Sequence, residues 1–250
     1  MKKSFLHLAL LSVFALYSHL ALAQGDPKAV VEKAIAAHGG EAKIARLNRV
    51  HSKAEGTIDA LPNQPPVPFV GESWRWDDNS KMTITMRVQG VKVSVTDAVH
   101  GDTQWRQLFG KTQELAKEEV AEIQESRHVD KIAKLGFLKD DTVELASLPE
   151  SKIADKEAVG VVVKSKGHKD VKLYFDKESG LLLKVEHSSL DLLSGKEVLE
   201  ELLLSDYQDK DGLKYAMKST LMRDGKKIMD GKVTELEFVD KMDQATFARP

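Results

Sequence analysis

Cysteine is absent from all 250 residues of the chain. This absence excludes disulfide staples, thiol chemistry, thiolate metal sites and a lipid-modified N-terminal cysteine. No run of basic residues stands out either, which argues against nucleic acid or an anionic membrane surface as the main partner. After the first two dozen residues, no apolar stretch is long enough to span a membrane. A chain without these features must be held together by a hydrophobic core of its own.

The N-terminus has the pattern of a secretory signal peptide. Lys2 and Lys3 precede an apolar run from Phe5 to Leu20, and Ala21-Leu22-Ala23 fits a small-x-small cleavage site. An uncleaved membrane anchor is the alternative, but the run is short and is interrupted by polar residues. We therefore expect residues 1–23 to be a cleaved signal peptide, with residues 24–250 forming a single exported domain. Without Lys2 and Lys3, the 37 basic residues become 35 against 39 acidic ones, a net charge of −4.

No catalytic signature is found in the chain. No serine lies in a nucleophile elbow, and His38-Gly39-Gly40 is better explained as the end of a helix than as a phosphate loop. The histidines lack the spacing of metal ligands. His100, Asp102 and Asp97 could gather around a metal ion, although a polar turn between strands explains them better. We expect a protein that is not an enzyme and that uses no cofactor or metal.

Helical signals occur near the N-terminus and in the middle of the chain. Asp26-Pro27 is a helix start, apolar residues recur at helical spacing up to His38, and Gly39-Gly40 ends the pattern. A short helix is predicted over 41–46. A longer helix is predicted over 114–135, with a break near His128, where the apolar stripe drifts around the helix.

Most of the remaining chain alternates apolar and polar residues with the period of a β-strand. Asp-Gly and similar turns separate successive segments, which is typical of antiparallel hairpins. The apolar phase of the last segment shifts between Val233 and Leu236, which predicts a β-bulge. The loop at 62–68 is rich in proline. The predicted strands are 50–58, 69–77, 82–88, 91–95, 105–109, 142–146, 158–166, 170–176, 181–188, 197–208, 213–223 and 226–239.

Strands this long and numerous must curl. The predicted fold class is therefore mainly β with α: one large, strongly curved antiparallel sheet with N-terminal helices and a mid-chain helix that covers its concave face. Nothing in the sequence predicts a homodimer, so a monomer is expected.

Three segments carry a resemblance to a known family. They are Tyr174-Phe175-Asp176 with the turn at Gly180, the hairpin from Asp206-Tyr207 to Asp211-Gly212, and the closing segment 238–247. Together with the order of helices and strands, they resemble the superfamily of outer-membrane lipoprotein carriers and lipoprotein-sorting proteins (LolA-like fold). The resemblance implies that the curved sheet is an unclosed, strongly curved antiparallel β-barrel (half-barrel), with N-terminal helices and the mid-chain helix as a lid over a hydrophobic cavity. It also implies an arginine that holds the lid, for which Arg75 and Arg87 are the candidates.

The expected function is that of a periplasmic carrier or binding protein for a lipid or an acylated protein. The alternative is a sensor or protein-interaction module of the cell envelope that uses the same fold without a lipid. Apolar side chains on the strands are the candidate binding residues, although they could instead pack as an ordinary core. The candidates are Trp74, Trp76, Met82, Ile84, Met86, Val88, Val91, Val93, Val95 and Met217.

Overall fold

The computed structural model describes residues 25–59, 64–192 and 194–250. The predicted signal peptide and its cleavage site lie outside the described residues, as does part of the proline-rich loop. Among the described residues, no helix is long and apolar enough to cross a membrane.

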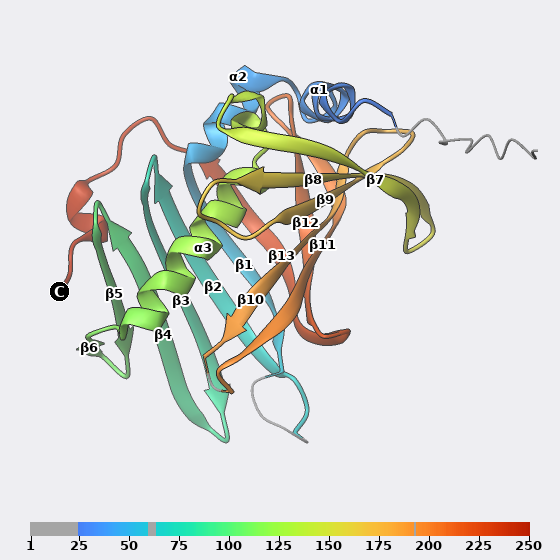
Figure 1. Ribbon diagram of the computed structural model, residues 1–250. Coiled ribbons are helices and arrows are strands. Elements are labelled where there is room, and N and C mark those ends of the chain that lie inside the picture. Colours follow the sequence, from blue (N-terminus) through green and yellow to red (C-terminus); the bar gives the residue numbers. More distant parts are fainter. Residues whose placement is uncertain (1–24, 60–63, 193) are drawn as a thin grey trace, which may run out of the picture.

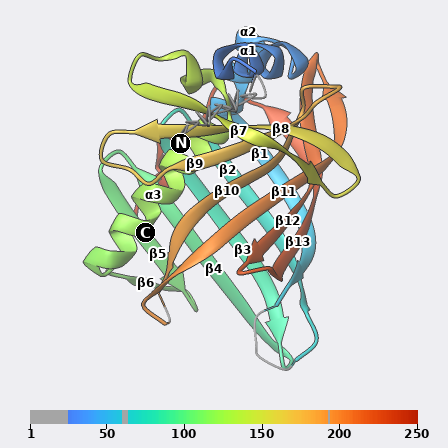
Figure 2. The same cartoon turned by 45° about the vertical axis from the view of Figure 1, so that its right-hand side comes forward.

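Two short helices lie together at one end of the molecule in both views (Figures 1 and 2). The helix α1 (Pro27–Ala37) begins after Asp26, whose side chain accepts a hydrogen bond from the Lys28 backbone N–H at 3.0 Å. It is followed by α2 (Glu41–Ile44) and the 3₁₀ segment η1 (Ala45–Asn48). The predicted N-terminal helices are thus confirmed, including their separation at Gly39 and Gly40, which both have positive φ.

The strands form one antiparallel sheet of 13 strands in the order β6-β5-β4-β3-β2-β1-β13-β12-β11-β10-β9-β8-β7. Each half of the chain is a meander, and β13 returns to pair with β1, which joins the two halves. The end strands β6 and β7 are not partners in this order, so the described sheet is an unclosed barrel. The strands are β1 (Arg49–Ile58), β2 (Val67–Trp76), β3 (Asn79–Val88), β4 (Val91–His100), β5 (Thr103–Leu108), β6 (Lys111–Gln113), β7 (Val143–Ile153), β8 (Lys156–Ser165), β9 (Val171–Asp176), β10 (Leu182–Asp191), β11 (Lys196–Lys210), β12 (Leu213–Arg223) and β13 (Lys226–Phe238).

The predicted bulge in the last strand is present. Lys53 of β1 lies opposite Glu235, and the next residue, Ala54, lies opposite Val233, so one residue of β13 is skipped. The extra residue lets Val233 and Leu236 point to the same side of the sheet despite the shift in their alternation.

The helix α3 (Lys117–Ala133) lies across the concave side of the sheet, over β1 to β4 (Figure 1). The predicted break near His128 is wrong, because α3 runs on to Ala133 and the 3₁₀ segment η2 (Gly136–Lys139) follows it. A drifting apolar stripe does not break this helix because much of its surface is held by polar contacts. Two details of the sheet were also missed: the short strand β6, and the extension of β7 past a bulge at Pro149.

The main hydrophobic core fills only one part of the half-barrel. Fully buried valines, leucines and Phe175 of β8 to β10 pack against α1 and against the C-terminal end of α3 with η2. The outer face of the other half has a smaller core, in which Phe247 of the 3₁₀ segment η3 (Gln244–Phe247) is buried and its carbonyl accepts a hydrogen bond from Trp105 Nε1 at 3.0 Å. On the concave face of β2 to β4, Phe69 and Val99 are buried, and the other side chains are only partly buried or exposed.

Candidate functional site

Strand β2 defines which side chains face α3. Arg75 forms an ion pair with Asp130 of α3, with 2.9 Å between Nη2 and Oδ2. Because side chains alternate along a strand, Phe69, Gly71 and Ser73 share the face of Arg75, while Trp74 lies on the opposite face. The pairing of β2 with β3 then places Met82, Ile84 and Met86 on the α3 side.

Seven of the predicted binding residues form one apolar surface on this concave side. Ile84, Met86 and Val88 of β3 lie directly opposite Val95, Val93 and Val91 of β4, whereas Met82 lies opposite Asp97. Five of the seven residues are partly buried and two are exposed. Met82 is 46 % and Val91 is 59 % exposed. The surface, called the concave apolar face below, consists of Met82, Ile84, Met86, Val88, Val91, Val93 and Val95. Met217, on β12, is buried, with 5 % of its surface exposed.

Trp74 and Trp76 do not belong to this surface. Trp74 stacks on His51 with 4.8 Å between ring centroids, and His51 Nε2 lies 2.9 Å from Glu72, all on the outer face of β1 and β2. The guanidinium of Arg49 lies 4.5 Å from the centroid of the Trp76 ring. The two tryptophans do share a face, as their spacing predicts, but alternation alone does not say which face is concave. Their placement among residues that line a cavity was therefore wrong.

Polar contacts hold α3 to the strands β2 to β5. Besides the Asp130 pair, Arg106 of β5 donates to Glu119 at 2.8 Å, and Arg127 donates to the carbonyl of Asp78 at 2.8 Å. Arg106 is also bound by Asp97 through two hydrogen bonds of 2.6 and 3.3 Å, which orient its guanidinium and raise its pKa. Charged contacts at both ends of α3 thus anchor the helix on this side.

A second set of contacts holds the other side of α3. Glu122 accepts hydrogen bonds from the hydroxyl of Ser189 at 2.7 Å and from the backbone N–H of Leu190 at 3.1 Å, both on β10. Glu125 contacts His168, in the turn between β8 and β9, at 2.9 Å. The helix therefore bridges the two arms of the curved sheet.

Apolar burial, by contrast, is confined to the C-terminal end of α3. Ile132 is its only buried residue, and Val129 and Ala133 pack beside it against the core. Val120 and Ile123, in the N-terminal half, are only partly buried. Since surface ion pairs contribute about 0–1 kcal/mol each, the N-terminal half is held far less firmly than the C-terminal end. Such an element can lift from one end.

Of the two arginines that could hold the helix, the structure selects Arg75. Arg87 is exposed on the outer face and donates to the carbonyl of Gly90 at 3.5 Å. Asp130 binds Arg75 and also lies 3.1 Å from Lys134 Nζ. Burial lowers the pKa of Lys134 and raises the pKa of the neighbouring Tyr215 hydroxyl. The anchor is therefore a partly desolvated cluster under the helix.

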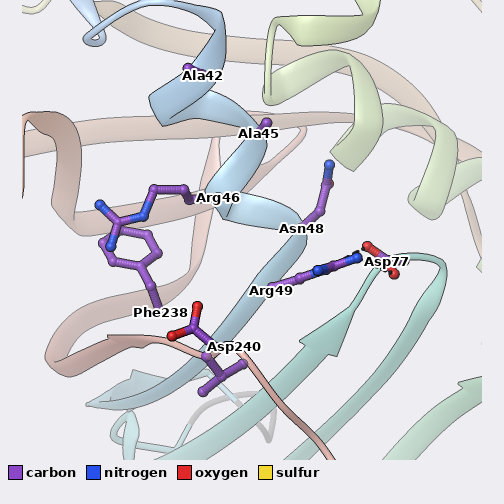
Figure 3. Close-up of a pocket in the computed structure, with 9 residues that line it drawn as sticks. Ala42, Ala45, Arg46, Asn48, Arg49, Asp77, Phe238 and Asp240 are labelled. Carbon is purple, nitrogen blue, oxygen red and sulfur yellow. Dashed lines mark hydrogen bonds and ion pairs between the residues drawn. The ribbon is translucent and has the colours of Figure 1, made fainter.

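Two surface pockets flank the stacked pair Arg46 and Phe238, in which the guanidinium carbon is 3.8 Å from the ring centroid. One, of about 430 Å³, is drawn in Figure 3, where Arg49 points toward Asp77 and Asp240 lies nearby. The other, of about 450 Å³, extends toward Asp211. Arg49 and Arg46 are already paired with Asp77 and Asp211, at 3.0 and 3.3 Å. These pockets lack the apolar walls that an acyl chain needs.

In the part of the chain that the structure describes, no group of three or more histidine and carboxylate side chains is arranged to hold a metal ion. His100 and Asp102 lie at the turn that joins β4 to β5. Asp97 is bound by Arg106 instead.

Comparison with solved structures places this architecture among LolA-like folds. A LolA superfamily protein from Nitrosomonas europaea aligns over 90 % of this chain and 98 % of its own, with 12 % identity and a TM-score of 0.53. A domain assigned to an outer membrane lipoprotein-sorting protein from Vibrio parahaemolyticus aligns over 88 % and 94 %, with 11 % identity and a TM-score of 0.53. A DUF1329 family protein from Desulfovibrio piger aligns over 90 % and 98 %, with 14 % identity and a TM-score of 0.56.

The fold that the family resemblance implies is thus confirmed. It is an unclosed antiparallel half-barrel with helices, of the kind found in lipoprotein-sorting and LolA superfamily proteins. No family model matches the sequence, and no curated protein matches it. At this level of identity the likeness concerns the fold and not the binding residues.

Sequence reasoning missed the residues that hold α3. Glu119, Glu122 and Glu125 each place a carboxylate against a strand or a turn. The only signal in the sequence is their spacing of three residues, which also describes an exposed helix face.

Proposed function

We propose that this protein binds the acyl chain of a lipid or of a lipidated protein on its concave apolar face, in the cell envelope, without catalysing a reaction. The observation that carries the proposal is a continuous, partly exposed apolar surface on β3 and β4, lying beneath a helix held mainly by charges. A contiguous apolar surface that is partly exposed to solvent is typical of binding sites. The LolA-like fold and the signal-like N-terminus support the same assignment.

The energetics are adequate for such binding. Each buried methylene contributes about 0.8 kcal/mol, so ten methylenes contribute roughly 8 kcal/mol before ordering costs. That corresponds to micromolar affinity without one polar contact. Methionine suits such a surface because its flexible thioether adapts to the shape of a chain. Met82 and Met86 supply that property here.

Release requires α3 to move. Its ionic anchors on β2 and β5 and its hydrogen bonds to β10 can break one by one, while Ile132 keeps the C-terminal end fixed in the core. We therefore assign α3 the role of a lid that pivots near Ile132.

The test is native mass spectrometry of the chain from Gln24 to Pro250, purified from a bacterial periplasm without detergent and then titrated with palmitate. We expect a bound lipid or the uptake of palmitate. Met86→Asp would place a carboxylate within the concave apolar face and should weaken binding at least tenfold, since burying an unpaired charge is costly.

Val70→Asp is the matched control. Val70 lies on the neighbouring strand β2 and is 59 % exposed, but on the outer face. The Val70→Asp variant should therefore bind palmitate as the wild type does. A bare chain mass with no uptake of palmitate would refute the proposal and favour the alternative, an interaction module of the envelope that uses the same fold without a lipid.

A further inference from the structure

Three histidines gather where α3 meets the arm formed by β8 to β10. His128 lies on α3, His168 in the turn between β8 and β9, and His187 on β10. The rings of His128 and His168 are stacked, with centroids 3.7 Å apart and planes 7° from parallel. His187 shares its strand face with Ser189, which binds Glu122 of α3. Each of the three side chains is therefore at, or next to, a contact that fixes the helix.

The hydrogen bonds of these rings suit the neutral forms of His128 and His187. Nε2 of His128 and Nδ1 of His187 are both buried and have no hydrogen-bond partner. Protonation would turn each of them into a donor without an acceptor, which is unfavourable in a buried site. His168 differs, because its Nδ1 lies 2.9 Å from the carboxylate of Glu125. The stacked His168 ring adds to the effect of burial and makes protonation of His128 less favourable.

The charged groups around the three histidine rings come from α3, from the turn between β8 and β9, and from β11. The carboxylate of Glu200 on β11 is held by Arg223 at 2.9 Å, and Lys169 is paired with Glu197 at 2.7 Å. Glu122 and Glu125 are occupied by hydrogen bonds to the sheet and turn. Most of the negative charge near the rings is therefore already engaged. The groups that act on the histidines are Glu122, Glu125 and Lys131 of α3, Lys169 of the turn, and Glu200 of β11.

The direction of the electrostatic effect follows from this geometry. Burial, and then the neighbouring His168, lower the pKa of His128 from its ordinary value of 6.5, and burial lowers the pKa of His187. When α3 lifts, both rings are solvated and regain ordinary proton affinity. Below pH of about 6.5 the lifted form therefore binds more protons than the closed form, so acidification favours lifting. Above that pH both forms are neutral and the closed form is unaffected.

We propose that His128, His168 and His187 form a pH-sensitive latch that holds α3 closed at neutral pH and releases it on acidification. One additional proton in the lifted form raises the ratio of lifted to closed molecules by up to about tenfold for each pH unit below about 6.5, and two raise it by up to about 100-fold. The consequence for an acyl ligand, release at acidic pH, rests on the proposed function, whereas the movement of α3 does not.

The latch can be tested on the whole chain without any ligand. Because the protein has no cysteine, Gln124→Cys on α3 and Lys164→Cys on β8 can be spin-labelled, and the distance distribution measured by double electron–electron resonance at pH 7.5 and 5.5. We expect the ratio of long to short distances to rise about tenfold or more at pH 5.5.

His128→Phe keeps an aromatic ring in the stack, removes a buried nitrogen that has no partner, and cannot be protonated. It should reduce the pH response by at least the factor that one proton contributes, while leaving the distances at pH 7.5 unchanged. His100→Phe, at the far end of β4, is the control and should keep the full response. Equal distributions at the two pH values, or an unaltered response in His128→Phe, would overturn the latch. Absence of palmitate binding at pH 7.5 with an intact distance response would refute the proposed function alone.

Discussion

The substitution Asp130→Asn tests whether charges, in addition to apolar packing, hold α3 on the sheet. Asp130 is the shared partner of Arg75 and Lys134, at 2.9 and 3.1 Å. Asparagine keeps the size of the side chain and removes its charge. Both cations then lose their carboxylate, and the ammonium of Lys134, only 17 % exposed, has its charge least well compensated by solvent.

The expected size of the effect follows from the exposure of the three groups. Arg75 is 26 % and Asp130 45 % exposed, so each pair is partly screened by water and contributes about 0.5–1 kcal/mol. Loss of both pairs should therefore destabilise the closed position by about 1–2 kcal/mol, which multiplies the lifted population by roughly 5 to 30. The free energy of global unfolding should change by no more than the same amount.

Hydrogen–deuterium exchange of the amides of α3 measures this opening, because a short helix that has lost its tertiary contacts unfolds readily in water and exposes its amides. For local opening in rapid equilibrium, protection falls by the same factor as the closed form is destabilised. Protection should fall most in the first three turns of the helix and least around Ile132, which stays in the core.

Glu118→Gln provides the comparison. It removes the same charge from an exposed position in the first turn of the same helix. Its effect on protection should stay below about twofold. If Asp130→Asn and Glu118→Gln reduced protection equally, or if Asp130→Asn had no effect, the ionic anchor would be rejected and apolar packing would have to hold the helix.

Three further predictions concern the scaffold. Asp176 accepts hydrogen bonds from two backbone N–H groups and pairs with Lys156 at 2.7 Å, which lowers its pKa from 3.8 to about 2. Asp176→Asn should therefore reduce the free energy of unfolding at pH 7, measured by urea titration, by about 2 kcal/mol. A carboxylate whose pKa is lowered in the folded state stabilises the protein only while it is ionised, so the difference between variant and wild type should shrink as the pH falls from about 4 to 2. A difference that stays constant over this pH range would contradict the assignment. Phe69→Ala should reduce the same free energy by about 3 kcal/mol, because Phe69 is buried on the concave side, and a loss below about 1 kcal/mol would show that this part of the sheet is loosely packed. Trp105→Phe leaves the buried carbonyl of Phe247 without its donor and should be less stable by about 1–3 kcal/mol in urea, unless a water replaces the indole.

Most of the elements follow from local pattern in the sequence. Alternation and Asp-Gly turns specify the hairpins, since a strand buried on one face requires a period of two. The phase shift between Val233 and Leu236 was sufficient to predict the bulge that the pairing of β1 with β13 contains. Asp26-Pro27 and Gly39-Gly40 set the ends of α1 for stereochemical reasons that need no tertiary contact. The family resemblance then supplied the half-barrel architecture.

The assignment of the concave face, by contrast, depends on long-range packing. Trp74 and Met86 each belong to an alternating strand, and period-two patterns are identical for the two faces of a curved sheet. The ion pair between Arg75 and Asp130, some 55 residues apart in the chain, identifies the Met86 side of the sheet as the one that α3 covers. Likewise, Glu122, Glu125 and His128 look like a solvated helix face until the sheet brings β10 and the β8–β9 turn against them. The sequence by itself therefore determined the elements and their order, whereas the curvature of the sheet decided which side chains form the concave apolar face and which hold the helix over it.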